Sequence, residues 1–300
     1  MANERDQVLM LVDRAAAQMM RREDDLAREI MQAYERARQE LMAAFMDAVS
    51  TLGPDPTPAQ IRRLANDSAL IQAVTNRLAQ LEREFAEFMR TGIDDVADAA
   101  FQMALAEVKI LAVGAGVTLF PFAVDPLLEL TIGSAIEQIP DVVASLRANI
   151  LSQMRESLAA GDRVGDIARA LFNRTGSVFR NGMTSAELMV RRAVVQAENN
   201  ARSLFYDEAK KQLPGLQKQA VAHVGAGTTE TCLRVHGQIQ DLDQPFEISG
   251  KPSFGRRQMQ SPFHWNCRTR VVAYLPIFEE GSAMTTAAMR QAARKELGDR

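Results

Sequence analysis

Residues 52–58 read Leu-Gly-Pro-Asp-Pro-Thr-Pro and separate two long segments with helical periodicity. Apolar residues recur at steps of four and seven over residues 26–49, and mostly at steps of three and four over residues 61–88. Such spacing places apolar side chains on one face of a helix. The prolines and glycine between the segments break the helix, and Thr57 with Gln60 fits a capping box that starts the next one. The pattern predicts an antiparallel helical hairpin, with an intermolecular coiled coil as the alternative.

Helical signals continue through the middle of the chain. Pro126 and Pro140 each open a helical run, and a shorter helix is expected over residues 162–173. The sequence Thr-Ser-Ala-Glu at 184–187 fits a second capping box, which predicts a helix start there and a helix that runs to Pro214. We therefore expect separate helices on the two sides of residue 184.

The texture changes after Gln219, where short β-prone pieces lie among Gly, Pro and Asp. These pieces are Ala220–Val224, Gln238–Ile239, Phe246–Ile248 and Thr269–Leu275. The predicted fold is mainly α with a small α+β C-terminal module. The expected regions are a helical hairpin or coiled-coil-like region over 1–105, an apolar connector over 106–139, the module over 140–280, and a terminal helix or loose tail over 281–300.

The amino-acid composition and charge exclude some classes of protein. Hydrophobic residues make up 47% of the 300 residues and charged residues 24%, which excludes a disordered or collagen-like chain. Residues 1–160 carry 15 Lys and Arg against 24 Asp and Glu, a net charge of −9, whereas residues 161–300 carry 20 against 14, a net of +6. The two halves are expected to face different neighbours. Two cysteines exclude a disulfide scaffold.

The most apolar stretch is 110–124, which is shorter than the roughly 18 apolar residues of a spanning helix and contains glycine and proline. We interpret it as a buried helix or packed connector, and its alternative is a segment that meets a membrane or an apolar partner surface. The charged N-terminus gives no signal-peptide pattern. We expect a soluble protein made in a cytoplasm.

All histidines and cysteines lie between positions 223 and 267. Four of them form two pairs, Cys232 with His236 and His264 with Cys267. Two ligand pairs joined by a β-prone loop are typical of small tetrahedral metal sites, and zinc suits mixed sulfur and imidazole ligands. The alternatives are histidines hydrogen-bonded in a small core with buried cysteines, and a Cys232–Cys267 disulfide, which a reducing cytoplasm disfavours.

Catalytic signals are weak. His264-Trp265-Asn266 hints at a nuclease site, but no nearby carboxylate or second metal-binding histidine accompanies it. Val113-Gly114-Ala115-Gly116 lacks the Lys-Ser/Thr of a phosphate-binding loop. The sequence predicts no enzyme.

The same residues carry a resemblance to a known family. The segment Thr228–Ile239, with Cys232 and Gly237, and the segment Ser261–Val272, with its Pro-Phe-His-Trp-Asn-Cys-Arg run, resemble the C-terminal module of phage head-morphogenesis proteins. These are the minor head proteins similar to phage Mu protein F. The upstream segment 191–209 is similar to the family's Arg-Thr-Glu helix, and the resemblance covers roughly residues 140–275. Thr229 stands where many members have a cysteine, and Thr269 follows Cys267-Arg268 where a second cysteine is common.

The resemblance implies a virion protein made in the host bacterial cytoplasm, with few copies at the portal vertex. Its expected partners are the portal protein, capsid or scaffolding proteins, packaged DNA without sequence preference, and other copies of itself. Four arginines flank the His-Cys segment: Arg256, Arg257, Arg268 and Arg270. They would contact DNA phosphates or an acidic protein surface. The alternative interpretation is that they only form a solvated surface. Two other functions stay open: a virion protein ejected with DNA that contacts the host membrane through 110–124, and a metal-dependent nuclease.

Overall fold

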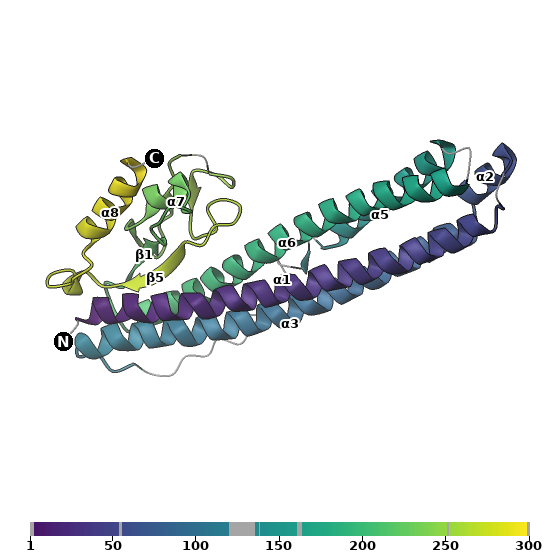
Figure 1. Cartoon of the computed structure of the whole chain (residues 1–300). Helices are drawn as coiled ribbons and strands as arrows, with labels where there is room; N and C mark the ends of the chain where they lie inside the picture. The colour runs from purple at the N-terminus through teal and green to yellow at the C-terminus, as the bar shows by residue number, and fades with distance from the viewer. Residues whose placement is uncertain are drawn as a thin grey trace. The chain divides into compact units, whose positions relative to one another are not determined.

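The computed structural model of the chain describes residues 3–53, 56–119, 136–137, 139–160, 164–250 and 252–298. Within these residues helices dominate, and short antiparallel strands gather near the C-terminus (Figure 1). The predicted fold class, mainly α with a small α+β region, is confirmed.

Long helices alternate with much shorter elements along the chain. The helices are α1 (Glu4–Ser50), α2 (Pro58–Ala65), α3 (Ser68–Gly114), α5 (Ile139–Ala160), α6 (Val164–Lys210), α7 (Glu230–Val235), the 3-10 turn η1 (Pro276–Phe278) and α8 (Thr286–Gly298). The strands are β1 (Gln217–Val221), β2 (Ile239–Asp241), β3 (Phe246–Glu247), β4 (Arg257–Gln258) and β5 (Arg270–Tyr274). The four predicted β-prone pieces overlap β1, β2, β3 and β5. Strand β4 was not predicted, because two residues are too few to show an alternating pattern.

Contacts between residues divide the chain into two compact units. Unit 1 comprises residues 1–23, 92–135 and 191–300, and unit 2 comprises residues 24–91 and 136–190. Helices α1, α3 and α6 contribute residues to both units. Each unit therefore joins segments that are far apart in the sequence.

The helical hairpin forms the centre of unit 2. Leu78 and Phe85 of α3 are buried, and the Phe85 ring packs edge-on against Tyr34 of α1 with 6.2 Å between ring centroids. Arg36 of α1 lies 3.4 Å from Glu84 of α3 at the rim of this contact. The apolar stripe predicted from the sequence is thus covered within this chain, as a hairpin requires.

The connection between the hairpin helices is partly as predicted. The Thr57 hydroxyl accepts the N–H of Gln60 at 3.3 Å, and the Gln60 side chain accepts the N–H of Thr57 at 2.8 Å, so the capping box is confirmed. The prediction that one helix continues from there is wrong. Helix α2 ends after eight residues, and the Asp67 carboxylate accepts the N–H groups of Ala69 and Leu70 at the start of α3. An Asx cap of this kind competes with helix continuation.

The predicted helix start at Thr184 is also wrong, because α6 runs without a break through this position. The Thr184 hydroxyl donates to the carbonyl of Arg180 at 3.1 Å, a bond made inside a helix. Two features of α6 favour continuity. Phe179 is fully buried, and Gly182 faces Leu146 of α5 so closely that an added Cβ would lie 3.1 Å from it. Packing of this face outweighs the roughly 1 kcal/mol that a cap contributes.

The apolar stretch 110–124 is described only as far as residue 119. Its first five residues belong to the end of α3, where Leu111 and Ala112 are buried. Residues 120–124 and the predicted helix start at Pro126 lie outside the described residues. Among the residues that the structure does describe, no helix combines the length and apolar character needed to cross a membrane.

The strands of unit 1 form two small antiparallel sheets. The first has the order β2-β1-β5, with Gln217 opposite Tyr274 and Val221 opposite Arg270, and the second pairs β3 with β4. Helix α8 lies beside α7 (Figure 1). Residues 281–300 therefore contain a packed helix rather than a loose tail.

A buried ion pair fixes β5 to the helices of unit 1. Arg202 of α6 pairs with Glu107 of α3, and neither side chain is exposed. The Tyr206 hydroxyl donates to Glu107 at 2.5 Å, and the backbone N–H of Ala273 in β5 donates to it at 3.1 Å. Because Glu107 accepts hydrogen bonds from both α6 and β5 in a buried position, this cluster ties β5 to α3 and α6.

Candidate metal centre

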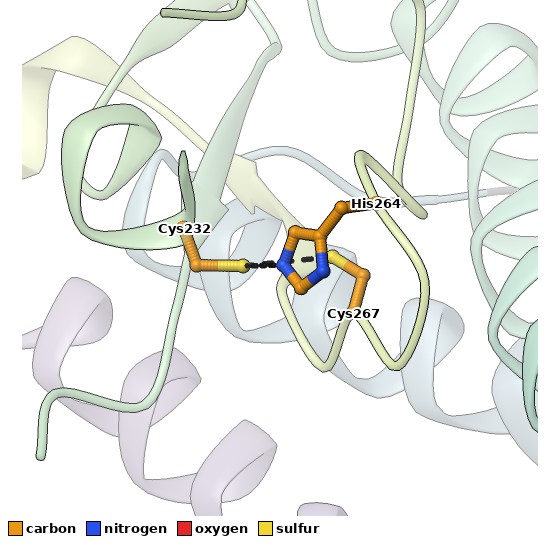
Figure 2. A group of neighbouring side chains, drawn as sticks. All are labelled: Cys232, His264 and Cys267. Carbon is orange, nitrogen blue, oxygen red and sulfur yellow. Dashed lines mark hydrogen bonds between the residues drawn. The ribbon is translucent and has the colours of Figure 1, made fainter. Parts of the chain in front are cut away.

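Three ligand-type side chains meet between α7 and the turn that precedes β5 (Figure 2). They are Cys232, His264 and Cys267, whose donor atoms all lie within 4.8 Å of one another. Their residues are 3%, 7% and 2% exposed. The structure thus brings together three of the four ligands predicted from the sequence.

Local backbone signals place each ligand. Thr229 is the N-cap of α7 and accepts the N–H of Cys232, which sets the cysteine in the first turn of the helix. The N–H of Cys267 donates to the carbonyl of His264 at 3.2 Å, and Asn266 between them has a φ of 57°. Asparagine tolerates this left-handed conformation better than most residues, so the turn closes and its two ligands face α7.

The imidazole of His264 is oriented by its neighbours. Its Nδ1 lies 2.5 Å from the carbonyl oxygen of Trp265, which only accepts, so Nδ1 carries the proton. Nε2 points to the cysteines and lies 2.8 Å from both Cys232 Sγ and Thr229 Oγ1. A backbone acceptor behind the ring is the usual partner of a metal-binding histidine.

The distances fit a metal ion with little adjustment. Cys232 Sγ and Cys267 Sγ are 3.7 Å apart, close to the ~3.8 Å that a tetrahedral zinc imposes through Zn–S bonds of ~2.3 Å. Nε2 of His264 is a hydrogen-bond distance from Cys232, and coordination would move it back by roughly 0.7 Å. Two thiols and one imidazole are donors that zinc prefers. This cluster can bind a metal ion.

The protonation of the two thiols is coupled. The hydrogen bond from Cys232 lowers the pKa of Cys267 well below its ordinary value, against the opposing effect of burial, and hydrogen bonds from His264 and Ser261 act in the same direction. The same hydrogen bond and burial raise the pKa of Cys232. Burial lowers the pKa of His264, but hydrogen bonding to Cys267 overcomes this, and the net pKa is raised. A metal ion bound by both sulfurs would displace the remaining thiol proton.

The assignment of His236 as a ligand is wrong. Helix α7 ends at Val235, and His236 leaves it with a ψ of 126°, so its side chain does not follow the helical spacing from Cys232. Its Nδ1 accepts the N–H of Ala222 at 3.0 Å, and burial lowers its pKa to about 4. His236 is the hydrogen-bonded core histidine that the sequence left as an alternative.

The four predicted surface arginines differ in their exposure and in their partners. Arg256 and Arg257 are exposed and form no ion pair within the described part of the chain. Arg268 is half exposed and lies 3.8 Å from Glu23. Arg270 is paired with Glu198 at 3.0 Å with its side chain only 12% exposed, so its assignment to a contact surface is wrong.

Sequence reasoning missed one further group of side chains. The guanidinium of Arg192 lies over the rings of Phe254 and Trp265. No periodicity links a residue of α6 to two residues of the loops before β5, and only the tertiary structure brings them together. Trp265 sits inside the His-Cys segment, where the sequence assigned it no role.

Comparison with known proteins does not identify a family. No protein-family model, no curated protein and no solved structure matches the chain. The resemblance to head-morphogenesis proteins therefore stays a prediction that rests on the residues of the two segments 228–239 and 261–272.

Proposed function

We propose that the chain is a structural minor head protein of a tailed bacteriophage, associated with the portal and capsid, that takes part in head assembly and in DNA packaging or delivery. One observation carries the proposal. The segment that resembles the head-morphogenesis signature folds back onto α7 and sets His264 and Cys267 against Cys232, across 32 and 35 positions of sequence. The residues that carry the resemblance thus share one site.

The metal ion in this proposal is zinc, and its role is to hold the small module together. Both cysteines belong to a cluster of nine buried residues around β1, α7 and β5, which is a small core. In such a module the free energy of zinc binding adds directly to the free energy of folding. The three ligands are at most 7% exposed, which suits a structural ion better than a catalytic one. We therefore propose no enzymatic reaction.

The arginine pair Arg256 and Arg257 supports a contact with an anionic partner. The two side chains are exposed, adjacent and unpaired within the described residues. Phosphates of packaged DNA or an acidic face of the portal would match them. Binding to duplex DNA would then be weak, independent of sequence and steeply dependent on salt. Replacing both by Glu should remove it, whereas Arg294→Glu on α8 should weaken it much less.

The association with the virion is tested by co-expression with the portal and capsid proteins of the same phage. The full chain should co-purify with the portal, and the double variant Cys232→Ser/Cys267→Ser should co-purify less because its module is loosened. His223→Ala, which changes an exposed histidine outside the cluster, is the matched control. Failure of the wild-type chain to associate with either partner would contradict the proposal. Metal-dependent DNA cleavage that disappears in His264→Ala would instead establish the nuclease alternative.

A further inference from the structure

In unit 1 an exposed tryptophan contacts a partly buried phenylalanine, and the guanidinium of an arginine lies over both rings. The rings of Phe254 and Trp265 meet edge to face, with 5.0 Å between centroids. The Cζ atom of Arg192 lies 4.6 Å from the Phe254 centroid and 5.4 Å from the Trp265 centroid. Trp265 is nevertheless 48% exposed, although burial of an indole is favourable. About half of the Trp265 surface therefore remains accessible to a ligand.

A pocket of about 250 Å³ is lined by Phe254 of this pair, whereas Trp265 lies beside Phe254 outside the lining. Phe254 and Arg192 form one side of it, and Gln196 of α6, Gln258 of β4 and Gln260 contribute amide groups. Among the described residues that line the pocket, none is acidic and none is a branched aliphatic. Its volume is below the ~300 to 1,000 Å³ of pockets that hold drug-sized ligands, so it admits about one ring system.

Several polar groups at this pocket have no partner in the protein. Within the described part of the chain, Gln196 and Gln260 make no side-chain hydrogen bond, and Arg192 makes only its two ring contacts. Gln258 donates one hydrogen bond, to the carbonyl of Gly255 at 2.9 Å, and its amide oxygen is free. A ligand can therefore find both donors and acceptors at this pocket, beside an aromatic face and a positive charge.

We propose that this pocket, which Phe254 lines, and the half-exposed indole of Trp265 beside it together bind an unpaired base of single-stranded DNA. A planar heterocycle stacks on the indole, the glutamine amides bond to its edge, and Arg192 meets the adjoining phosphate. Aromatic stacking combined with arginine is how proteins hold single strands. A base within a duplex cannot bind in this way, because neighbouring base pairs cover both of its faces. It would first have to leave the duplex in order to enter a pocket that holds one ring system.

A protein partner is the other class of occupant, and the lining disfavours it. Aromatic residues and Arg are common in the cores of protein interfaces, but such cores are more apolar than this pocket, which presents the amides of Gln196, Gln258 and Gln260. The positive charge at Arg192 also calls for an anionic ligand. This inference does not rest on the proposed role in the phage head.

The test uses the fluorescence of Trp265, which is the chain's single tryptophan. The full-length protein is titrated at low salt with a 12-nucleotide single strand, with the same strand in a duplex, and with an abasic oligonucleotide of equal length. We expect the single strand to quench the emission and to bind at least about 5-fold more tightly than the other two, since stacking contributes ~1 to 3 kcal/mol per base.

Variants separate stacking from charge, with binding followed by anisotropy of a labelled single strand. Trp265→Ala should weaken binding roughly 5- to 150-fold, and Gln196→Leu, which leaves the aromatic pair intact, should weaken it less but measurably. Arg294→Gln, which removes one charge from exposed α8, should change little. Equal affinity for the abasic strand, or unchanged binding in both Trp265→Ala and Gln196→Leu, would overturn the proposal. Absence of oligonucleotide binding would also overturn it and leave a protein partner as the occupant.

Discussion

The Sγ atoms of Cys232 and Cys267 lie 3.7 Å apart, although 35 positions separate the two residues in sequence. This distance is too long for a disulfide and close to the separation of two thiolates on one tetrahedral zinc. His264 completes the group from three positions before Cys267. Composition alone would leave these two cysteines as buried apolar residues. Their short separation, together with His264, makes them a candidate metal centre.

Protein purified without chelator should contain about one zinc ion per chain. Because protons compete with the metal for thiolate and imidazole, the zinc content should fall as pH falls. Cys232→Ser should lose the metal and His223→Ala should keep it, as measured by elemental analysis. A zinc content near zero, with a melting temperature indifferent to chelator, would refute the metal centre.

Thr229→Cys should tighten zinc binding. The Thr229 hydroxyl is 2.8 Å from His264 Nε2, so a thiol at this position reaches the same space and supplies a fourth ligand. Structural zinc sites are almost always four-coordinate, and affinity should rise at least about tenfold in a competition assay with a chromogenic chelator. Thr228→Cys, which adds a thiol one position away, should not produce this gain.

His236 should make stability depend on pH. Burial lowers its pKa to about 4 in the folded chain from an ordinary value near 6.5. Between these pH values the unfolded state binds more protons, so stability is present above pH ~6.5 and is lost as pH falls toward 4, by up to about 3 kcal/mol. Urea unfolding at pH 7 and pH 5 measures this, with chelator present so that metal loss does not contribute. His236→Asn should show a smaller difference between the two pH values, and an equal difference would exclude His236 as its source.

Glu107→Ala should destabilise unit 1 by about 3 to 5 kcal/mol, because it leaves the Arg202 charge buried without a partner. The double variant Glu107→Leu/Arg202→Met removes both charges and should lose less than the single one. Glu156→Ala breaks a half-exposed pair with Arg174 and should cost below about 1 kcal/mol. Chemical denaturation measures the free energy of unfolding of the three variants. A double variant that is less stable than Glu107→Ala would contradict this prediction.

Leu78→Asp should destabilise unit 2 by several kcal/mol, because Leu78 is 1% exposed in the hairpin contact and a buried charge has no partner there. Ala73→Asp introduces the same charge at an exposed position of α3 and should have a small effect. Thermal melting followed by circular dichroism compares the two. An unchanged melting temperature in Leu78→Asp would show that the predicted stripe is not a core.

The two capping-box patterns of the chain have different outcomes for a physical reason. The box predicted at Thr57 is present, since its bonds span three residues. The similar pattern at Thr184 lies inside α6, because burial of Phe179 and close packing at Gly182 stabilise a continuous helix more than a cap does. Asp67 is a cap of equally short range, and its position two residues before Ala69 is a signal from which the start of α3 could be predicted.

The sequence by itself determined the helical hairpin, the positions of four strands and the ligand pair His264 and Cys267, because periodicity, turn residues and three-residue spacing act over short stretches of chain. Only the tertiary structure decided that Cys232 joins this pair while His236 bonds to Ala222 instead. The reason is that His236 lies one residue beyond the end of α7, where the backbone leaves the helical conformation and the side chain changes direction. It also decided the Glu107–Arg202 pair and the placing of Arg192 over Trp265. Such contacts depend on how distant elements pack, and no local pattern records that packing.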